Sequence, residues 1–136
     1  MGNYVYFEHT ADIGIEATGH SLAEAFEQAA LGMFGLMVQL DTVRPETIRT
    51  VQVDADDIEA LLFEWLNTLI YHVDAENLLF SQFSITAFSG NHLSAVCRGE
   101  KYDPSRHEIK TVVKSATYHE LTVDAQRHSL RVIIDI

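Results

Sequence analysis

Two stretches with helical periodicity constrain the fold of this chain more than any other feature of its sequence. The first begins at Ser21, a good N-cap residue that forms a capping box with Glu24 three residues later. The apolar residues that follow recur at helical spacing and predict an amphipathic helix of about 17 residues: Leu22, Ala25, Phe26, Ala29, Met33, Leu36 and Met37. Gly32 and Gly35 lie late in this helix, where they either weaken it or allow close packing against a sheet.

The second helical pattern follows a run of acidic residues: Asp54, Asp56, Asp57 and Glu59. Carboxylates this close together suggest a metal site, but acids in a first helical turn also cap N–H groups and complement the helix dipole. We favour capping, because an apolar helical face comes next: Ile58, Leu61, Leu62, Trp65, Leu69 and Val73.

The rest of the chain alternates between apolar and polar residues, which is typical of half-buried strands. Gly90-Asn91 is a tight-turn signal between two of these segments, whereas residues 105–115 remain ambiguous. The sequence therefore predicts an α+β fold, a single domain over residues 1–136, with two amphipathic helices packed on largely antiparallel β-sheet. The expected strands are residues 4–8, 13–18, 46–54, 79–89, 92–102, 117–124 and 129–135.

Charge and composition narrow the possible functions. The chain has 136 residues, 9 Lys and Arg against 20 Asp and Glu, and a formal net charge of −11. Such a charge argues against direct nucleic-acid binding and against anionic membranes, and it favours a basic protein partner, a cation or plain solubility. With no signal peptide, no apolar stretch of membrane-spanning length and one cysteine, Cys97, we expect a soluble cytoplasmic protein.

No familiar catalytic motif is present in the sequence. It lacks GxSxG, Walker A, HExxH and GxGxxG motifs, and its 7 histidines show no zinc spacing. Cys97 lies in a β pattern beside Val96, which indicates a core residue more than a nucleophile. These observations weaken the case for an enzyme.

Three segments carry side chains that can do chemistry. His9 and Asp12 lie in a turn-like segment, where such residues converge on a ligand or simply cap the backbone. The last strand pattern runs to Asp135 and Ile136, so two carboxylates lie together there, either as hard ligands for Ca²⁺, Mg²⁺ or Mn²⁺ or as a plain strand end. Lys114, with Tyr118 and His119 shortly after it, forms a third group that can bind anions or donate protons.

Taken in order, these residues resemble the archease family. The resemblance spans nearly the whole chain, and it rests on the following motifs: Glu8-His9-Thr10-Ala11-Asp12-Ile13-Gly14-Ile15, Ser21-Leu22 with Glu24-Ala25-Phe26, Leu61-Leu62 with Glu64-Trp65-Leu66-Asn67, Gly99-Glu100, Val113-Lys114, Thr117-Tyr118-His119 and Asp135-Ile136. Ser115-Ala116 departs from the family's usual Ala followed by Val or Ile, which is a conservative change.

The resemblance implies a non-enzymatic activator of the RNA-splicing ligase, which joins 2′,3′-cyclic-phosphate and 5′-hydroxyl RNA ends, as in tRNA splicing. The activator would promote guanylylation of that ligase by GTP, restore its turnover and broaden its nucleotide use. The family's divalent metal site carries over to Asp12, Asp135 and the terminal carboxylate of Ile136, with Ca²⁺ expected and Mg²⁺ or Mn²⁺ as alternatives. Lys114 matches a position implicated in activation, and His9 is a weaker candidate for the same role.

Two other functions remain open from the residues alone. One is a metal-dependent phosphoester hydrolase that uses Asp12 and Asp135, with His9 or His119 as the base. The other is a general chaperone-like binding module, which would protect many unrelated proteins from aggregation.

Overall fold

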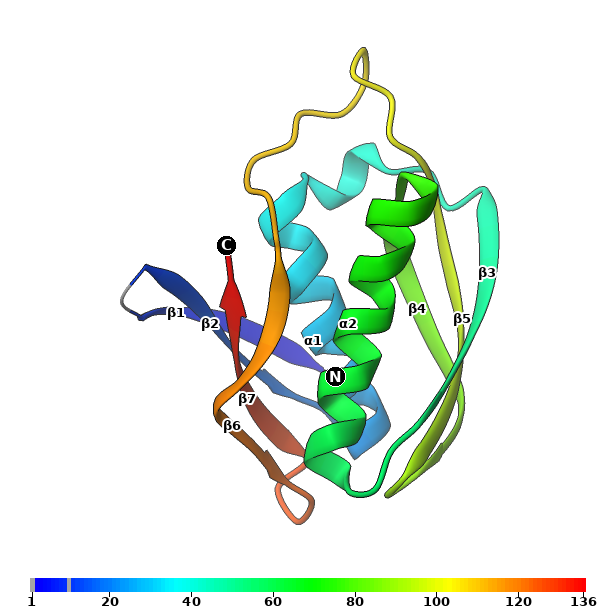
Figure 1. The fold of residues 1–136 in the computed structure, drawn as a ribbon. Helices are drawn as coiled ribbons and strands as arrows, with labels where there is room; N and C mark the ends of the chain where they lie inside the picture. Colours follow the sequence, from blue (N-terminus) through cyan, green and yellow to red (C-terminus); the bar gives the residue numbers. More distant parts are fainter. Residues whose placement is uncertain (1, 10) are drawn as a thin grey trace.

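The computed structural model describes residues 2–9 and 11–136, and it confirms the predicted α+β class (Figure 1). Two α-helices, one short 3₁₀ helix and seven strands follow one another along the chain. They are β1 (Asn3–His9), β2 (Asp12–Thr18), α1 (Leu22–Met37), η1 (Leu40–Thr42), β3 (Thr47–Asp54), α2 (Ile58–Glu76), β4 (Leu78–Ser89), β5 (His92–Lys101), β6 (Ser115–Asp124) and β7 (Ser129–Asp135).

The strands divide into two antiparallel sheets that share no strand. One sheet has the order β1-β2-β7-β6, and the other has the order β3-β5-β4. The helices lie between the sheets: α1 packs against β1, β2 and β7 on one side and β4 on the other, while α2 packs against β6 and β3 (Figure 1). Each sheet thus buries one face against the helices, which explains the apolar–polar alternation of the strands.

The helix ends follow the capping signals of the sequence. The hydroxyl of Ser21 accepts a hydrogen bond from the Glu24 N–H at 3.1 Å, and the Glu24 carboxylate accepts one from the His20 N–H at 2.7 Å. At the start of α2, the Asp57 carboxylate accepts a hydrogen bond from the Ala60 N–H at 2.8 Å. Asp57 therefore acts as an N-cap, as the capping interpretation of the acidic run predicts.

The glycines of α1 allow a close approach between the helix and β1. The Tyr6 hydroxyl donates a hydrogen bond to the Gly32 carbonyl at 2.8 Å, and a Cβ atom at Gly35 would lie only 2.8 Å from the same hydroxyl. Of the two explanations for these glycines, close packing is the one that the structure supports. Deeper in the core, the Trp65 indole N–H of α2 donates to the Phe26 carbonyl of α1 at 3.0 Å and joins the two helices.

Residues 102–114, which include most of the ambiguous segment, form a loop without helix or strand. A polar cluster anchors this loop: the Glu100 carboxylate accepts hydrogen bonds from the Arg44 N–H at 2.8 Å, from Arg106 and from His107 Nε2 at 2.9 Å. Burial alone would raise the pKa of Glu100, but these donors outweigh it and lower the pKa to about 2. No helix among residues 2–9 and 11–136 is both long and apolar enough to cross a membrane.

Candidate functional site

Three strand ends meet at one corner of the four-stranded sheet, and they carry the candidate ligands. Asp12 is the first residue of β2 and pairs with Asp135, the last residue of β7, which in turn pairs with Ser115, the first residue of β6. Residues directly opposite one another in antiparallel strands project from the same face. The carboxylates of Asp12 and Asp135, more than 120 positions apart in the sequence, are therefore neighbours on one face of the sheet.

The β1–β2 hairpin places Asp12 at this corner. Ala11 has a φ of 61°, a left-handed conformation that turns the chain back so that His9 pairs with Asp12. Further along the hairpin, Phe7 lies directly over Gly14, where a Cβ atom would come within 2.0 Å of the ring. The Phe7 ring thus covers the middle of this face of the sheet, and the carboxylates of Asp12 and Asp135 lie beyond the ring, at the end of the strands.

Asn67 of α2 holds β6 against this corner. Its amide oxygen accepts a hydrogen bond from the Ala116 N–H at 3.0 Å, and its amide nitrogen donates to the Ala116 carbonyl at 3.3 Å. One residue before β6, the Lys114 N–H donates to the Asp135 carbonyl at 2.8 Å. Asn67 therefore completes the outer edge of β6 as a neighbouring strand would, and it fixes the segment that carries Lys114 and Ser115.

The Asp12–Asp135 pair carries two like charges at directly opposed positions, an arrangement that destabilises a sheet when nothing compensates it. Neither carboxylate forms an ion pair with a side chain that the structure describes. Arg131, also on β7, pairs instead with Glu16 at 4.0 Å and Glu120 at 3.5 Å, and its guanidinium lies 3.8 Å from the centre of the Phe7 ring.

The donor set at this corner fits a hard divalent cation. Carboxylate oxygens suit Ca²⁺, Mg²⁺ and Mn²⁺, and both aspartates are partly exposed to solvent. Within residues 2–9 and 11–136, however, no group of three or more His, Cys, Asp and Glu side chains is placed to hold a metal ion. The two aspartates alone would leave several coordination positions for a terminal carboxylate, water or a partner's oxygen atoms.

The other candidate residues lie at different distances from this corner. Lys114 is exposed and directly precedes Ser115, so it borders the carboxylate pair. The backbone of His9 pairs with Asp12, whereas its side chain lies outside what the structure describes. His119 is exposed and lies in the irregular part of β6, between the paired residues Thr117 and Thr122, where its Nε2 atom lies 3.2 Å from a carboxylate oxygen of Glu120.

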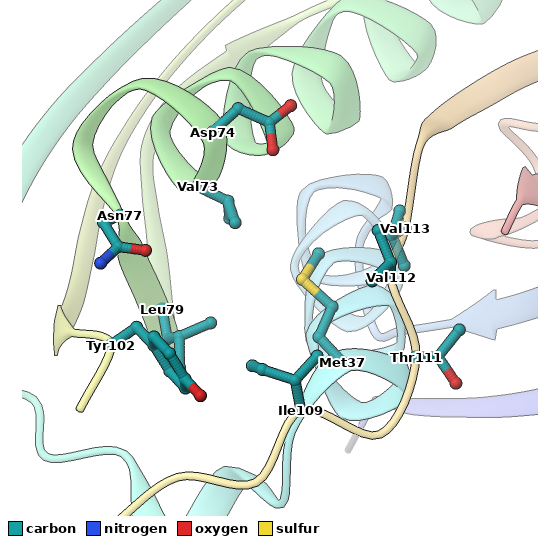
Figure 2. Close-up of a pocket in the computed structure, with 10 residues that line it drawn as sticks. All are labelled: Met37, Val73, Asp74, Asn77, Leu79, Tyr102, Ile109, Thr111, Val112 and Val113. Atoms are coloured by element: carbon teal, nitrogen blue, oxygen red, sulfur yellow. The ribbon is translucent and has the colours of Figure 1, made fainter. Parts of the chain in front are cut away.

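An apolar groove, which was not predicted from the sequence, lies beside Lys114. Figure 2 shows the groove between the C-terminal ends of α1 and α2 and the 102–114 loop. It has a volume of about 320 Å³ and is lined by Met37, Val73, Asp74, Asn77, Leu79, Tyr102, Ile109, Thr111, Val112 and Val113. The groove depends on contacts between distant segments, so no local pattern in the sequence marks it.

Comparisons with known proteins agree on one family. Residues 4–136 match the Archease protein family (MTH1598/TM1083). The chain is 42% identical, over an alignment 139 positions long, to the "Protein archease" of Sulfurisphaera tokodaii, with all of both chains covered. Its fold matches the solution structure of Methanobacterium thermoautotrophicum protein 1598 with a TM-score of 0.81, at 34% identity and 98% coverage of each chain.

A second solved structure shares the fold at lower similarity. It is the Thermotoga maritima crystal structure of an archease, which its authors call a possible chaperone. The TM-score is 0.61 at 21% identity, with 94% of this chain and 91% of that chain covered. At this level of identity the likeness concerns the fold alone.

Proposed function

Because the chain belongs to the archease family, we propose that it is a non-enzymatic activator of the RNA-splicing ligase that joins 2′,3′-cyclic-phosphate and 5′-hydroxyl RNA ends, as in tRNA splicing. In this proposal it acts in the cytoplasm, promotes guanylylation of the ligase by GTP, restores multiple turnover and broadens the ligase's nucleotide use. The observation that carries the proposal is the pairing of Asp12 with Asp135 beside Lys114, at a corner open to a partner.

In the proposed mechanism, Asp12 and Asp135 hold a divalent cation, with the terminal carboxylate of Ile136 as a third ligand. We propose Ca²⁺, with Mg²⁺ or Mn²⁺ as alternatives, because all the donors are hard oxygen atoms. The bound cation would supply positive charge for phosphate oxygens. The chain's own contribution is to hold the two aspartates in register, while the Lys114 ammonium offers a further positive charge from the adjoining loop.

The overall charge supports a protein partner for this activator. A net charge of −11 repels RNA but attracts the basic surface that an RNA-binding enzyme must present. The activator would therefore reach RNA chemistry through the ligase and not through direct contact with nucleic acid.

The test is a multiple-turnover ligation assay with the cognate ligase, with and without this protein. We expect Asp135→Asn to lower both divalent-ion affinity and activation by at least about tenfold, since it removes one charged ligand at nearly constant shape. Lys114→Ala should reduce activation while leaving stability nearly unchanged, because the side chain is exposed. Asp41→Asn, an exposed acid in η1, is the matched control and should activate as the wild type does.

Two further arms separate this proposal from its alternatives. The isolated protein should neither ligate RNA nor hydrolyse GTP or phosphoesters in the presence of Mn²⁺. Residues appended after Ile136 convert its carboxylate to an amide, so they should weaken both ion binding and activation. Unchanged activation by the Asp135→Asn and extended variants would exclude the carboxylate corner from the mechanism.

A further inference from the structure

One side of α2 forms an exposed surface with the chain segment that leads into β6. The stacked rings of Phe63 and Tyr118 mark one end of this contact, with centroids 4.2 Å apart and planes 12° from parallel. The hydrogen bonds between Asn67 and Ala116 lie in the middle, and Asp74 lines the groove with Val112 at the other end. Residues 112–118 thus run antiparallel to the helix, with α2 positions 63, 67 and 74 on one stripe.

This α2 seam surface, defined by Glu64, Tyr71, Asp74, Val112 and Tyr118, exposes large apolar side chains to solvent. Val112 is 70% exposed, Tyr71 is 65% exposed and Tyr118 is 54% exposed. Single exposed apolar residues are common, but these three lie along the contact between α2 and residues 112–118, which continues into the 320 Å³ apolar groove. Exposed apolar area next to a groove is typical of a surface that another protein covers.

The charge around the seam surface has a single sign. Residues 54–77 contain no Lys or Arg, and they hold these acidic residues: Asp54, Asp56, Asp57, Glu59, Glu64, Asp74 and Glu76. Only Asp54 and Glu76 form ion pairs with side chains in the described part of the chain. Partial burial, and then the charges of nearby Asp57, Glu64 and Asp56, raise the pKa of the Tyr118 hydroxyl. The aromatic stack therefore lies within a negative field.

We infer that the α2 seam surface docks a basic protein segment, one that inserts an apolar side chain into the groove and places flanking Arg or Lys side chains over the acidic helix. The exposed face of Tyr118 suits a guanidinium, because an aromatic face attracts a cation and nearby carboxylates can pair with it. This inference rests on the proposed function, under which the segment belongs to the RNA-splicing ligase. A second copy of this chain or an RNA would bring negative charge to a negative surface.

The position of the surface links docking to the carboxylate corner. Val112 and Val113 line the groove, and the next residue, Lys114, is hydrogen-bonded through its N–H to Asp135. A segment bound in the groove would therefore lie within two residues of Lys114. Docking on α2 would bring the corner of Asp12 and Asp135 against the surface of the same partner.

The inference can be tested by measuring the affinity of the full chain for the cognate ligase by biolayer interferometry, at about 50 mM and about 300 mM salt. We expect Glu64→Gln/Asp74→Asn to weaken binding roughly tenfold at low salt and to flatten the salt dependence, because it removes two of the attracting charges. Val112→Ser should weaken binding roughly tenfold at both salt concentrations, because it removes an apolar contact. The matched controls, Asp41→Asn/Glu46→Gln and Ile48→Ser, change exposed residues that are not part of the α2 seam surface, and they should bind within twofold of wild type.

The outcomes separate this inference from the proposed function. If the wild type binds and activates the ligase and the seam variants do so equally well, the seam surface is not the docking site, although the activator function stands. If the wild type neither binds nor activates the ligase, the proposed function is wrong and the inference falls with it. A dimer in sedimentation that Val112→Ser dissolves, or RNA binding that the variants change, would assign the surface to another occupant and overturn the inference.

Discussion

Asn67 offers the sharpest test of how the candidate site is held together. Replacing it with leucine keeps a side chain of similar size and a good helix former, so α2 itself should lose nothing. The substitution removes both hydrogen bonds to the backbone of Ala116, a residue that is only 2% exposed. An N–H and a carbonyl would then lie buried without a partner.

The size of the effect follows from these two groups. A buried polar group that loses its partner costs about 1–3 kcal/mol. Because β6 is an edge strand and water can reach part of the gap, we expect a total loss of about 2–4 kcal/mol from the free energy of unfolding. For a chain of this length, that corresponds to a fall in Tm of about 6–15 °C.

Urea unfolding of Asn67→Leu and wild type measures this loss, with Thr68→Ala on the same helix as a control expected to change stability by less than about 0.5 kcal/mol. Hydrogen exchange gives a local readout, since the Ala116 amide should lose its protection in Asn67→Leu ahead of the amides of β7. A stability change below about 0.5 kcal/mol, with Ala116 still protected, would show that water or the backbone replaces the amide and that Asn67 does not hold β6.

Three further predictions concern charge and packing. Asp12→Asn should raise the free energy of unfolding by about 0.5–1 kcal/mol in the presence of a chelator, because it relieves repulsion from Asp135. It should also remove the stabilisation that we expect added Ca²⁺ to confer on the wild type. Equal stabilisation of both proteins by Ca²⁺, measured by urea unfolding, would contradict the cation site. The pKa of Glu100 is lowered to about 2 in the folded state, so the ionised carboxylate stabilises the fold fully above its unfolded-state pKa of about 4, and this stabilisation is lost as the pH falls towards 2. Glu100→Gln should therefore make the free energy of unfolding less dependent on pH between about 4 and 2. Parallel pH profiles for the two proteins would refute this. Gly99→Ala should destabilise the protein by about 3 kcal/mol or more in thermal unfolding, because the added Cβ atom would lie 1.8 Å from the Leu79 carbonyl oxygen. A Tm close to that of the wild type would mean that the backbone of β4 can shift at little cost in free energy.

The helices and strands could be predicted because their signals are local. The capping box at Ser21 and the acid run before α2 mark helix ends through contacts within four residues, and both predictions were confirmed. Strand alternation likewise located all seven strands to within about two residues, an error typical of element ends. Residues 105–115 stayed ambiguous because the loop that contains most of them is anchored by Glu100, which accepts hydrogen bonds from several segments of the chain.

The candidate site was less accessible from the sequence. Asp12 and Asp135 were each singled out from the residues, but only the family resemblance joined them in one site, because alternation alone does not show that β2 pairs with β7 or that the strands divide into two sheets. Asn67 appeared only as part of a motif, because the role of a polar residue on a buried helix face depends on which backbone lies opposite. The groove and the α2 seam surface form where a loop packs against a helix, and such packing produces no periodic pattern in the amino-acid sequence.

The two sheets close loops of very different length, and this gives the molecule an order of assembly. The β4–β5 hairpin joins residues across a two-residue turn, whereas pairing β2 with β7 joins positions 12–18 to positions 129–135. Closing a loop of more than a hundred residues costs roughly 2 kcal/mol more entropy than closing one of about ten. The three-stranded sheet should therefore form early in folding and the four-stranded sheet late. For the same reason, the corner that holds Asp12 and Asp135 should be among the first parts of the native protein to unfold locally.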